Sequence, residues 1–151
     1  MNRHSRLLGN DPDKVAAQRP RGQRVFCSNR GQRGGCGRTF AWFFAAVLPR
    51  HSVTAALLMQ LFVGLLQGLA LKSAAEALRA PFVLETFYRL VRRLRRRLDV
   101  VRTCLCREHP APPSRHADPL LHSVEHLFAA FPNAAHAPAA FQQRFQRPFL
   151  G

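Results

Sequence analysis

The feature that most constrains the fold is a long amphipathic stretch from about residue 83 to residue 107. Its apolar side chains recur every three or four residues, which places them along one stripe of an α-helix. They are Phe87, Leu90, Val91, Leu94, Leu98, Val101 and Leu105. Arginines fill most of the other positions: Arg89, Arg92, Arg93, Arg95, Arg96, Arg97 and Arg102. The pattern predicts a helix about 36 Å long with one buried face and one strongly basic face.

Two shorter helices are predicted before this one. The first begins near Ser52, a suitable N-cap, and continues through an apolar run until Gly68, a residue type common at helix ends. The second is the alanine-rich segment "LKSAAEALR" at 71–79, and Pro81 prevents its smooth continuation. The three helices together predict a small bundle.

The C-terminal part resumes a helical pattern after a proline-rich segment. Asp118 followed by Pro119 is typical of a helix start, and Pro132 ends that helix. A last short helix is indicated by phenylalanines that step by four, at positions 141, 145 and 149.

We therefore predict a mainly α fold with four segments. Residues 1–50 form a basic segment with a short β and Cys/Gly-rich part, and "GNDPD" and "RPRG" near its start are turn signals. Residues 51–108 form the helical domain, 109–117 a proline-rich linker, and 118–151 a helical tail.

The charge of the chain indicates a polyanionic partner. Lysine and arginine number 23 against 8 aspartate and glutamate residues, a net charge of +15 at pH 7. Nucleic acid is the first candidate and an anionic membrane the second. A high-GC base composition would also raise the arginine content, but it does not explain the uneven distribution. No acidic residue occurs between Asp13 and Glu76, although nine lysines and arginines do.

The cysteines indicate a metal site or simple packing. The first residues lack the apolar core of a signal peptide, so we expect a reducing cytoplasm and no disulfide scaffold. Cys27 and Cys36 flank a glycine-rich turn, in which backbone N–H groups can turn toward a thiolate. Zinc needs four ligands, and only His4 precedes this pair as a further candidate. Cys104 and Cys106, at the end of the long helix, are better explained as a packed and an exposed free thiol.

Several of these motifs together resemble a known family. "RVFC…GGCGRTF" (residues 24–40), followed by helices and then "ETFYRLVRRLRRRL", is similar to the N-terminal zinc ribbon and helix-turn-helix of bacterial insertion-sequence transposases and their small non-catalytic relatives. The resemblance covers about residues 24–105 and lacks the first CxxC knuckle. It implies zinc at Cys27 and Cys36, completed by His4 or by a second chain of a homodimer.

The resemblance also implies a function in DNA binding. The segment 71–79 would be the supporting helix, and the helix from Val83 would enter the major groove. The residues expected at the DNA are Glu85, Thr86, Tyr88, Arg89, Arg92, Arg93 and Arg96. We expect no catalysis, because the few carboxylates after the long helix cannot build a transposase core, and no small-molecule substrate is indicated. The expected location is the cytoplasm, at the nucleoid.

Three alternatives stay open at this stage. The basic face is also compatible with an ordinary solvated bundle helix. Residues 53–71 are free of charge and meet the minimum length of a membrane-spanning helix, with cationic flanks at Arg50 and Lys72. The chain is also compatible with an orphaned fragment of a transposase gene that folds without a function of its own.

Overall fold

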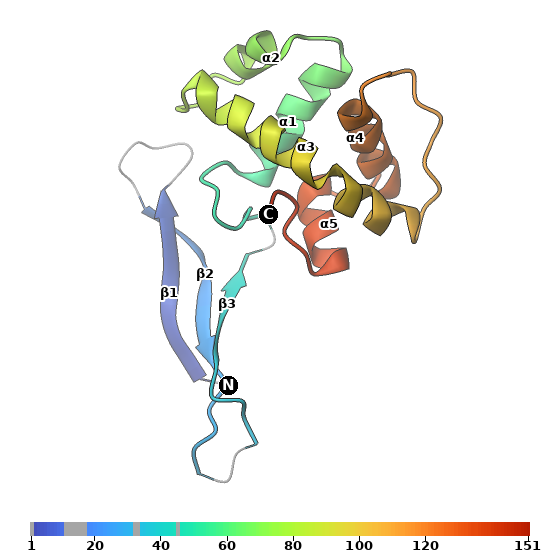
Figure 1. Ribbon diagram of the computed structural model, residues 1–151. Helices are drawn as coiled ribbons and strands as arrows, with labels where there is room; N and C mark the ends of the chain where they lie inside the picture. The colour runs from blue at the N-terminus through green and yellow to red at the C-terminus, as the bar shows by residue number, and fades with distance from the viewer. Residues whose placement is uncertain (1, 11–17, 32–33, 45) are drawn as a thin grey trace.

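The fold is mixed α/β, which corrects the prediction of a mainly α protein. The computed structural model describes residues 2–10, 18–31, 34–44 and 46–151, which form five helices and a three-stranded antiparallel sheet. In Figure 1 the sheet extends away from a body that contains all five helices. The prediction failed because strand pairing occupies a polar segment that had been expected to contain only a short β part.

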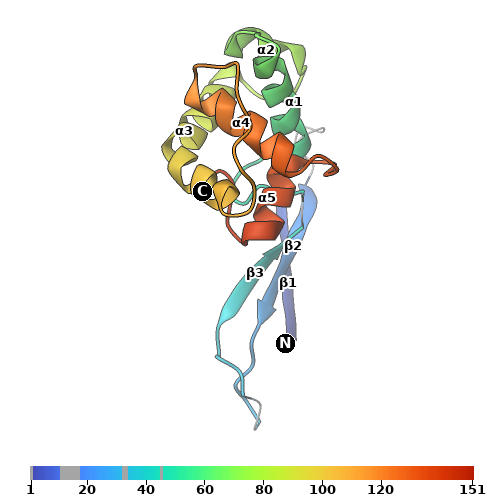
Figure 2. The same cartoon turned by 90° about the vertical axis from the view of Figure 1, so that its right-hand side faces the viewer.

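The helical body is built around one core to which every helix contributes. The helices are α1 (Ala55–Leu66), α2 (Leu71–Ala77), α3 (Leu84–Cys106), α4 (Pro119–Ala130) and α5 (Ala137–Phe145). α3 contacts α2 and α4, while α1 contacts α2, α4 and α5. Figure 2 shows the same body with α4 and α5 turned toward the viewer. Large buried side chains from four of these helices meet in the core: Phe62, Phe87, Leu94, Leu127 and Phe141.

The long basic helix lies close to its predicted limits. α3 runs from Leu84 to Cys106 and begins after Val83, which has extended backbone angles. Apart from Cys104, its buried side chains belong to the predicted apolar stripe, and α3 packs against α2 and α4. At its end, Cys104 is buried and Cys106 is exposed, both as free thiols. The prediction for these two cysteines is confirmed.

The apolar run at 53–71 contains one short helix, α1, and ends at the first residue of α2. The Thr54 hydroxyl accepts a hydrogen bond from the Leu57 N–H at 3.2 Å, so Thr54 and not Ser52 is the N-cap of α1. Gly68 has a φ of +87°, a left-handed conformation typical of the residue that follows a helix. α1 is therefore 12 residues long. Within the described ranges, no helix has both the length and the apolar character needed to cross a membrane, and the alternative of a spanning helix at 53–71 is therefore wrong.

The sheet consists of three consecutive strands, with the second in the centre. They are β1 (Asn2–Asn10), β2 (Gln18–Phe26) and β3 (Thr39–Phe43). The turn expected at "RPRG" is wrong, because these residues lie inside β2. Pro20 pairs with Leu8 beside an irregularity in the β1–β2 register, and such irregularities accommodate a proline within a strand. The other expected turn, "GNDPD", extends over residues 11–13, which lie outside the described residues.

A half-buried arginine connects the sheet to the helical body. Arg21 of β2 donates hydrogen bonds to the carbonyl oxygen of Leu48, at 3.0 Å, and to that of His51. From the other side, the Gln142 side chain of α5 donates to the Val47 carbonyl oxygen at 3.0 Å. The turn that precedes α1 is therefore held by both the sheet and α5.

The first C-terminal helix, α4, lies where it was predicted, whereas the last helix, α5, ends before the predicted Phe149. Asp118 is the N-cap of α4, and its Oδ1 accepts a hydrogen bond from the Leu120 N–H at 2.9 Å. α5 ends at Phe145, because Gln146 adopts a left-handed φ of 50°. Phe149 consequently lies beyond the helix that was expected to include it. Its side chain is nevertheless buried in the core.

Two histidines of α4 hold the proline-rich segment against the helical body. The Nε2 of His122 donates to the Pro112 carbonyl oxygen at 3.2 Å, and the Nε2 of His126 donates to the His109 carbonyl oxygen at 3.0 Å. His126 is buried, and this burial lowers its pKa below the ordinary value of 6.5. The neighbouring charges of His122, His109 and Arg102 act in the same direction.

The lowered histidine pKa values predict that the fold loses stability in weak acid. His51 resembles His126, because burial first and then the charges of Arg93 and Arg21 lower its pKa. Below pH 6.5, the ordinary histidine pKa, the unfolded chain therefore binds more protons than the folded chain. We expect the melting temperature to fall as the pH drops from about 7 to about 5.

Circular dichroism melts across this range measure the effect. The variant His126→Gln removes one of the two groups, and its melting temperature should fall less steeply with pH than that of the wild type. A wild-type melting temperature that stays constant over the range would contradict the assignment of buried neutral histidines.

Candidate nucleic-acid interface

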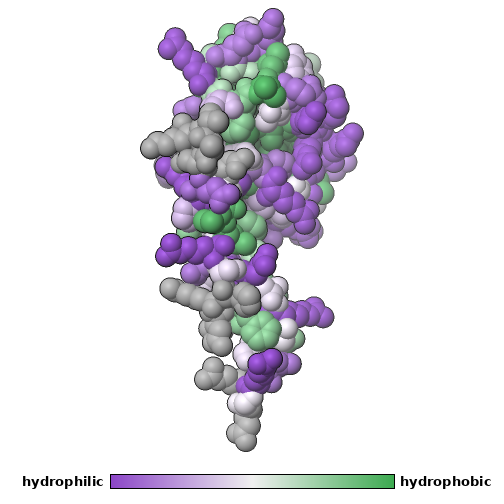
Figure 3. All heavy atoms as spheres, turned by 90° about the vertical axis from the view of Figure 1, so that its left-hand side faces the viewer, coloured by the Kyte–Doolittle hydropathy of each residue, from purple (hydrophilic) through white to green (hydrophobic). Residues whose placement is uncertain are grey.

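The first half of α3 exposes most of the side chains predicted to contact DNA. Phe87, Leu90 and Leu94 are buried, which leaves the positions between them facing solvent. The exposed members of the predicted set are Glu85, Tyr88, Arg89, Arg92, Arg93 and Arg96. Thr86, the seventh, is half-buried. Figure 3, which faces the side of the molecule on the left of Figure 1, shows hydrophilic residues over much of the helical body.

Not every arginine of α3 has a free charge. Arg89 forms an ion pair with Glu85 at 3.1 Å, one helical turn away. Arg95 donates two hydrogen bonds to the Asp118 carboxylate, at 3.0 and 2.6 Å, and these bonds lower the pKa of that carboxyl group. Both arginines are therefore partly neutralised.

A second group of arginines has no such neighbour. Within the described part of the chain, Arg92, Arg93 and Arg96 have no carboxylate partner. Arg96 lies four residues after Arg92 and three after Arg93, so it is close to both along the helix. These three charges are available to an external anion.

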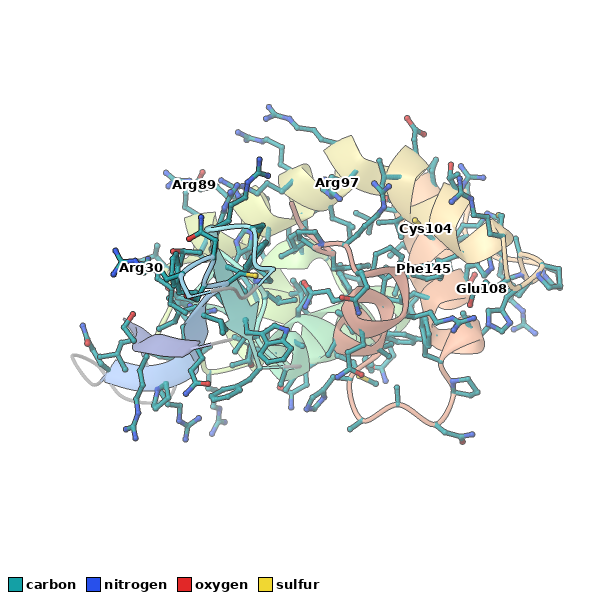
Figure 4. The ribbon with its side chains drawn as sticks, turned by 90° about the horizontal axis from the view of Figure 1, so that it is seen from below. Arg30, Arg89, Arg97, Cys104, Glu108 and Phe145 are labelled. Carbon is teal, nitrogen blue, oxygen red and sulfur yellow. The ribbon has the colours of Figure 1, made fainter. Side chains whose placement is uncertain are left out.

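Arg97 serves a different purpose from its neighbours. Its Nη2 donates a hydrogen bond to the Pro148 carbonyl oxygen at 3.1 Å, which ties α3 to the segment after α5. Figure 4 shows Arg89 and Arg97 at different points along α3. Arg97 is therefore engaged within the protein, in contrast to the exposed arginines of the first half of the helix.

A basic cavity lies beside this arginine group. It has a volume of about 250 Å³ and is formed between the start of α3 and the turn before α1. Its polar lining comes from three arginines, one histidine and two hydroxyl residues: Arg50, Arg89, Arg93, His51, Ser52 and Thr86. Guanidinium and hydroxyl groups are the side chains that most often bind phosphate oxygens. The cavity therefore has the chemistry of a phosphate site.

The turn that lines this cavity has two unusual properties. Arg50 adopts a left-handed φ of 63°, an uncommon conformation for a residue with a side chain, and its side chain is exposed. The Nε2 of His51 is buried without a hydrogen-bond partner among the described residues. Such backbone strain and such unpaired polar atoms are found most often at binding sites.

The cysteine pair forms a separate feature, in the hairpin between β2 and β3. The Cys36 N–H donates to the Cys27 Sγ at 3.3 Å, and the Gly37 N–H donates to the Cys27 carbonyl oxygen at 2.9 Å. The hydrogen bonds from Cys36, first from its backbone and then from its side chain, lower the pKa of the Cys27 thiol. The predicted contact of glycine-turn N–H groups with a thiolate is thus present in part.

The described residues do not complete a zinc site. A structural zinc ion needs four ligands. The described ranges contain no group of three or more histidine, cysteine, aspartate or glutamate residues that could hold a metal ion. The side chain of His4, the candidate third ligand, lies outside the described residues. Cys27 and Cys36 alone provide half of the required ligands.

The sequence predicted the exposed arginines but missed the residues opposite them. Ser52 was predicted as a helix N-cap, Arg50 only as a cationic flank of the apolar run, and His51 was given no role, although all three line the cavity. The polar character of these three residues, directly before an apolar run, was a signal in the sequence that they lie at the surface. Their position beside residues 86–93 depends on tertiary packing, which no local pattern encodes.

Comparison with protein-family models, with curated proteins and with solved structures finds no match for this chain. The resemblance to transposase recognition modules therefore depends on the residues quoted for it alone.

Proposed function

We propose that the chain is a non-catalytic DNA-binding protein, related to a transposase recognition module, that contacts duplex DNA through the first half of α3. The observation that carries this proposal is the group of exposed arginines at positions 92, 93 and 96 beside the basic cavity, which have no carboxylate partner among the described residues. Duplex DNA presents regularly spaced phosphates, which such a surface complements. In the cell, this function would place the protein at the nucleoid.

The arrangement of α2 and α3 supports a helix-turn-helix mode of binding. α2 is short and contacts α3, and residues 78–83 connect the two helices. In this motif the second helix enters the major groove and the first crosses the backbone. Tyr88 and Arg92 would then face the base edges, and the cavity beside Arg89 and Arg93 would hold a backbone phosphate. The hairpin that carries Cys27 and Cys36 would be a second contact with the DNA. A homodimer would present two copies of each contact.

Binding of a fluorescently labelled duplex, measured by anisotropy at several salt concentrations, tests the proposal. The logarithm of the association constant should fall linearly with the logarithm of the salt concentration. The variant Arg92→Ala/Arg93→Ala/Arg96→Ala should lower that slope by about 3, because each lost phosphate contact lowers it by about 1.

A variant with the same change in charge provides the control. Arg102, Arg107 and Arg115 lie toward the far end of α3 and beyond it, and all three are exposed. Their joint replacement by alanine should leave most of the slope unchanged. The proposal fails if no duplex binds at about 50 mM salt, or if the two triple variants weaken binding equally, which would indicate a nonspecific effect of net charge.

A further inference from the structure

A second surface of the molecule, on the sheet, carries exposed aromatic side chains. β3 is an edge strand that pairs only with β2 among the described strands. The exposed fractions are 44% for Phe40, 68% for Trp42, 40% for Phe43 and 56% for Phe44. Exposed aromatic residues gathered on one short segment indicate a binding surface rather than a packing surface.

The aromatic residues of β3 lie on both of its faces. Successive side chains of a strand alternate between faces, so Phe40 and Trp42 share one face and Phe43 lies on the other. In the pairing with β2, Trp42 lies opposite Gln23 and Phe40 lies opposite Val25. Two flat rings are therefore presented along one side of the strand, at a spacing set by the strand itself.

A groove of about 370 Å³ joins the end of β3 to α5 and the turn after it. Trp42 of β3 and Phe44, which follows β3, line one side of the groove, and Gln143 and Arg147 line the other. Within the described part of the chain, the side chains of Gln143 and Arg147 have no hydrogen-bond partner. The groove thus combines aromatic faces with an amide and a guanidinium group that are free to bind.

The charge of this region identifies the kind of occupant. Residues 18–44 contain six arginines and no acidic residue, and Arg24, Arg30 and Arg38 are exposed. Figure 4 shows Arg30 at the hairpin that connects β2 and β3. A second copy of the chain pairing along this edge would bring the two cationic surfaces together, which is unfavourable. A polyanion with flat apolar groups is complementary in both charge and shape.

We propose that β3 and the groove bind single-stranded nucleic acid, with a base stacked on Trp42. In a duplex the faces of the bases are already stacked, whereas a single strand leaves them available to aromatic side chains. Gln143 would bind a base edge, and Arg147 and Arg38 would bind phosphates. This surface uses none of the α3 residues that carry the duplex proposal, although Arg38 belongs to the hairpin proposed as a second duplex contact. Variants at Trp42 and variants on α3 therefore test the two proposals separately.

The only tryptophan of the chain is Trp42, so its fluorescence reports directly on this surface. Titration of the whole protein with oligothymidylate should quench the emission, because stacking on a base quenches an indole. In anisotropy measurements with the labelled strand, Trp42→Ala should weaken binding roughly five- to a hundredfold. Trp42→Phe, which keeps a ring for stacking, should recover most of that loss.

Controls separate this proposal from the duplex proposal. Val63, an apolar residue of α1 that is 38% exposed, provides a matched site, and Val63→Ala should bind the single strand as the wild type does. Quenching by the single strand in a protein that fails to bind duplex supports the sheet surface and removes the duplex proposal alone.

Two results would overturn the inference. The first is single-strand binding that Trp42→Ala leaves unchanged. The second is an absence of quenching together with a dimer that Trp42→Ala converts to a monomer in light scattering, since β3 would then be a protein interface. Circular dichroism checks that the variants are folded. Because Trp42 is 68% exposed, its replacement should change the stability of the fold little.

Discussion

Replacing Phe141 with alanine is expected to lower the free energy of unfolding by about 3–5 kcal/mol. Phe141 is fully buried in the middle of α5. Its ring centroid lies 4.8 Å from that of Phe145 and 5.3 Å from that of Phe149. The Phe149 ring in turn packs edge-on against the Phe62 ring of α1, with 6.2 Å between the ring centroids. Removal of the ring would leave a cavity between α5, the segment that follows it and α1.

Urea denaturation followed by circular dichroism measures this loss. The same substitution at an exposed phenylalanine gives the control, because Phe44 is 56% exposed. Phe44→Ala should change the free energy of unfolding by no more than about 0.5 kcal/mol. If Phe141→Ala costs no more than Phe44→Ala, the packing of α5 against α1 is not as described.

The elements with a strong local signal were predictable from the sequence. The limits of α3 were predicted from an apolar stripe sustained over several turns. The start of α4 was predicted from Asp118, whose side chain can cap a helix, next to Pro119. In both cases the residues that determine the structure lie within a few positions of it. The exposure of the arginines on α3 follows from the same periodicity.

The three-stranded sheet could not be predicted from the sequence, because the residues that stabilise each strand lie on a different strand. β1 and β2 have few apolar side chains, and Pro20 and Gly22 in β2 suggested a turn. A strand pair is stabilised by its partner across the hairpin, and the partner cannot be recognised when neither strand alternates between apolar and polar residues. The aromatic surface of β3 and the cavity beside Arg50 were missed for the same reason.

The end of α5 shows how a correct apolar pattern can give a wrong boundary. The spacing of Phe141, Phe145 and Phe149 fits one helical face, and the first and last of these are buried. The left-handed backbone of Gln146 and the following Pro148 end the helix before the pattern ends. Hydrophobic spacing determined which side chains enter the core, and the backbone determined how they reach it.

Gly22→Ala is expected to open the pairing of β2 with β3. A Cβ atom at position 22 would lie 1.9 Å from the Trp42 carbonyl oxygen and 2.8 Å from the Phe43 Cα. Both are backbone atoms of β3, so no side-chain rotation relieves the clash. Overpacking of this kind costs about 1–3 kcal/mol, and more where the backbone itself must move. The strand that carries the aromatic surface should therefore separate from the sheet.

Hydrogen exchange measured by mass spectrometry locates this change within the chain. In Gly22→Ala the amides of residues 39–43 should exchange faster, while those in the middle of α3 should keep the wild-type rate, because the helical core does not include Gly22. Gly34→Ala is the matched control, since a Cβ at Gly34 would have no atom within 4 Å. Gly22→Ala should therefore weaken single-strand binding more than duplex binding, because the main duplex contacts lie on α3. Equal exchange at 39–43 in both variants would mean that β3 does not lie against Gly22.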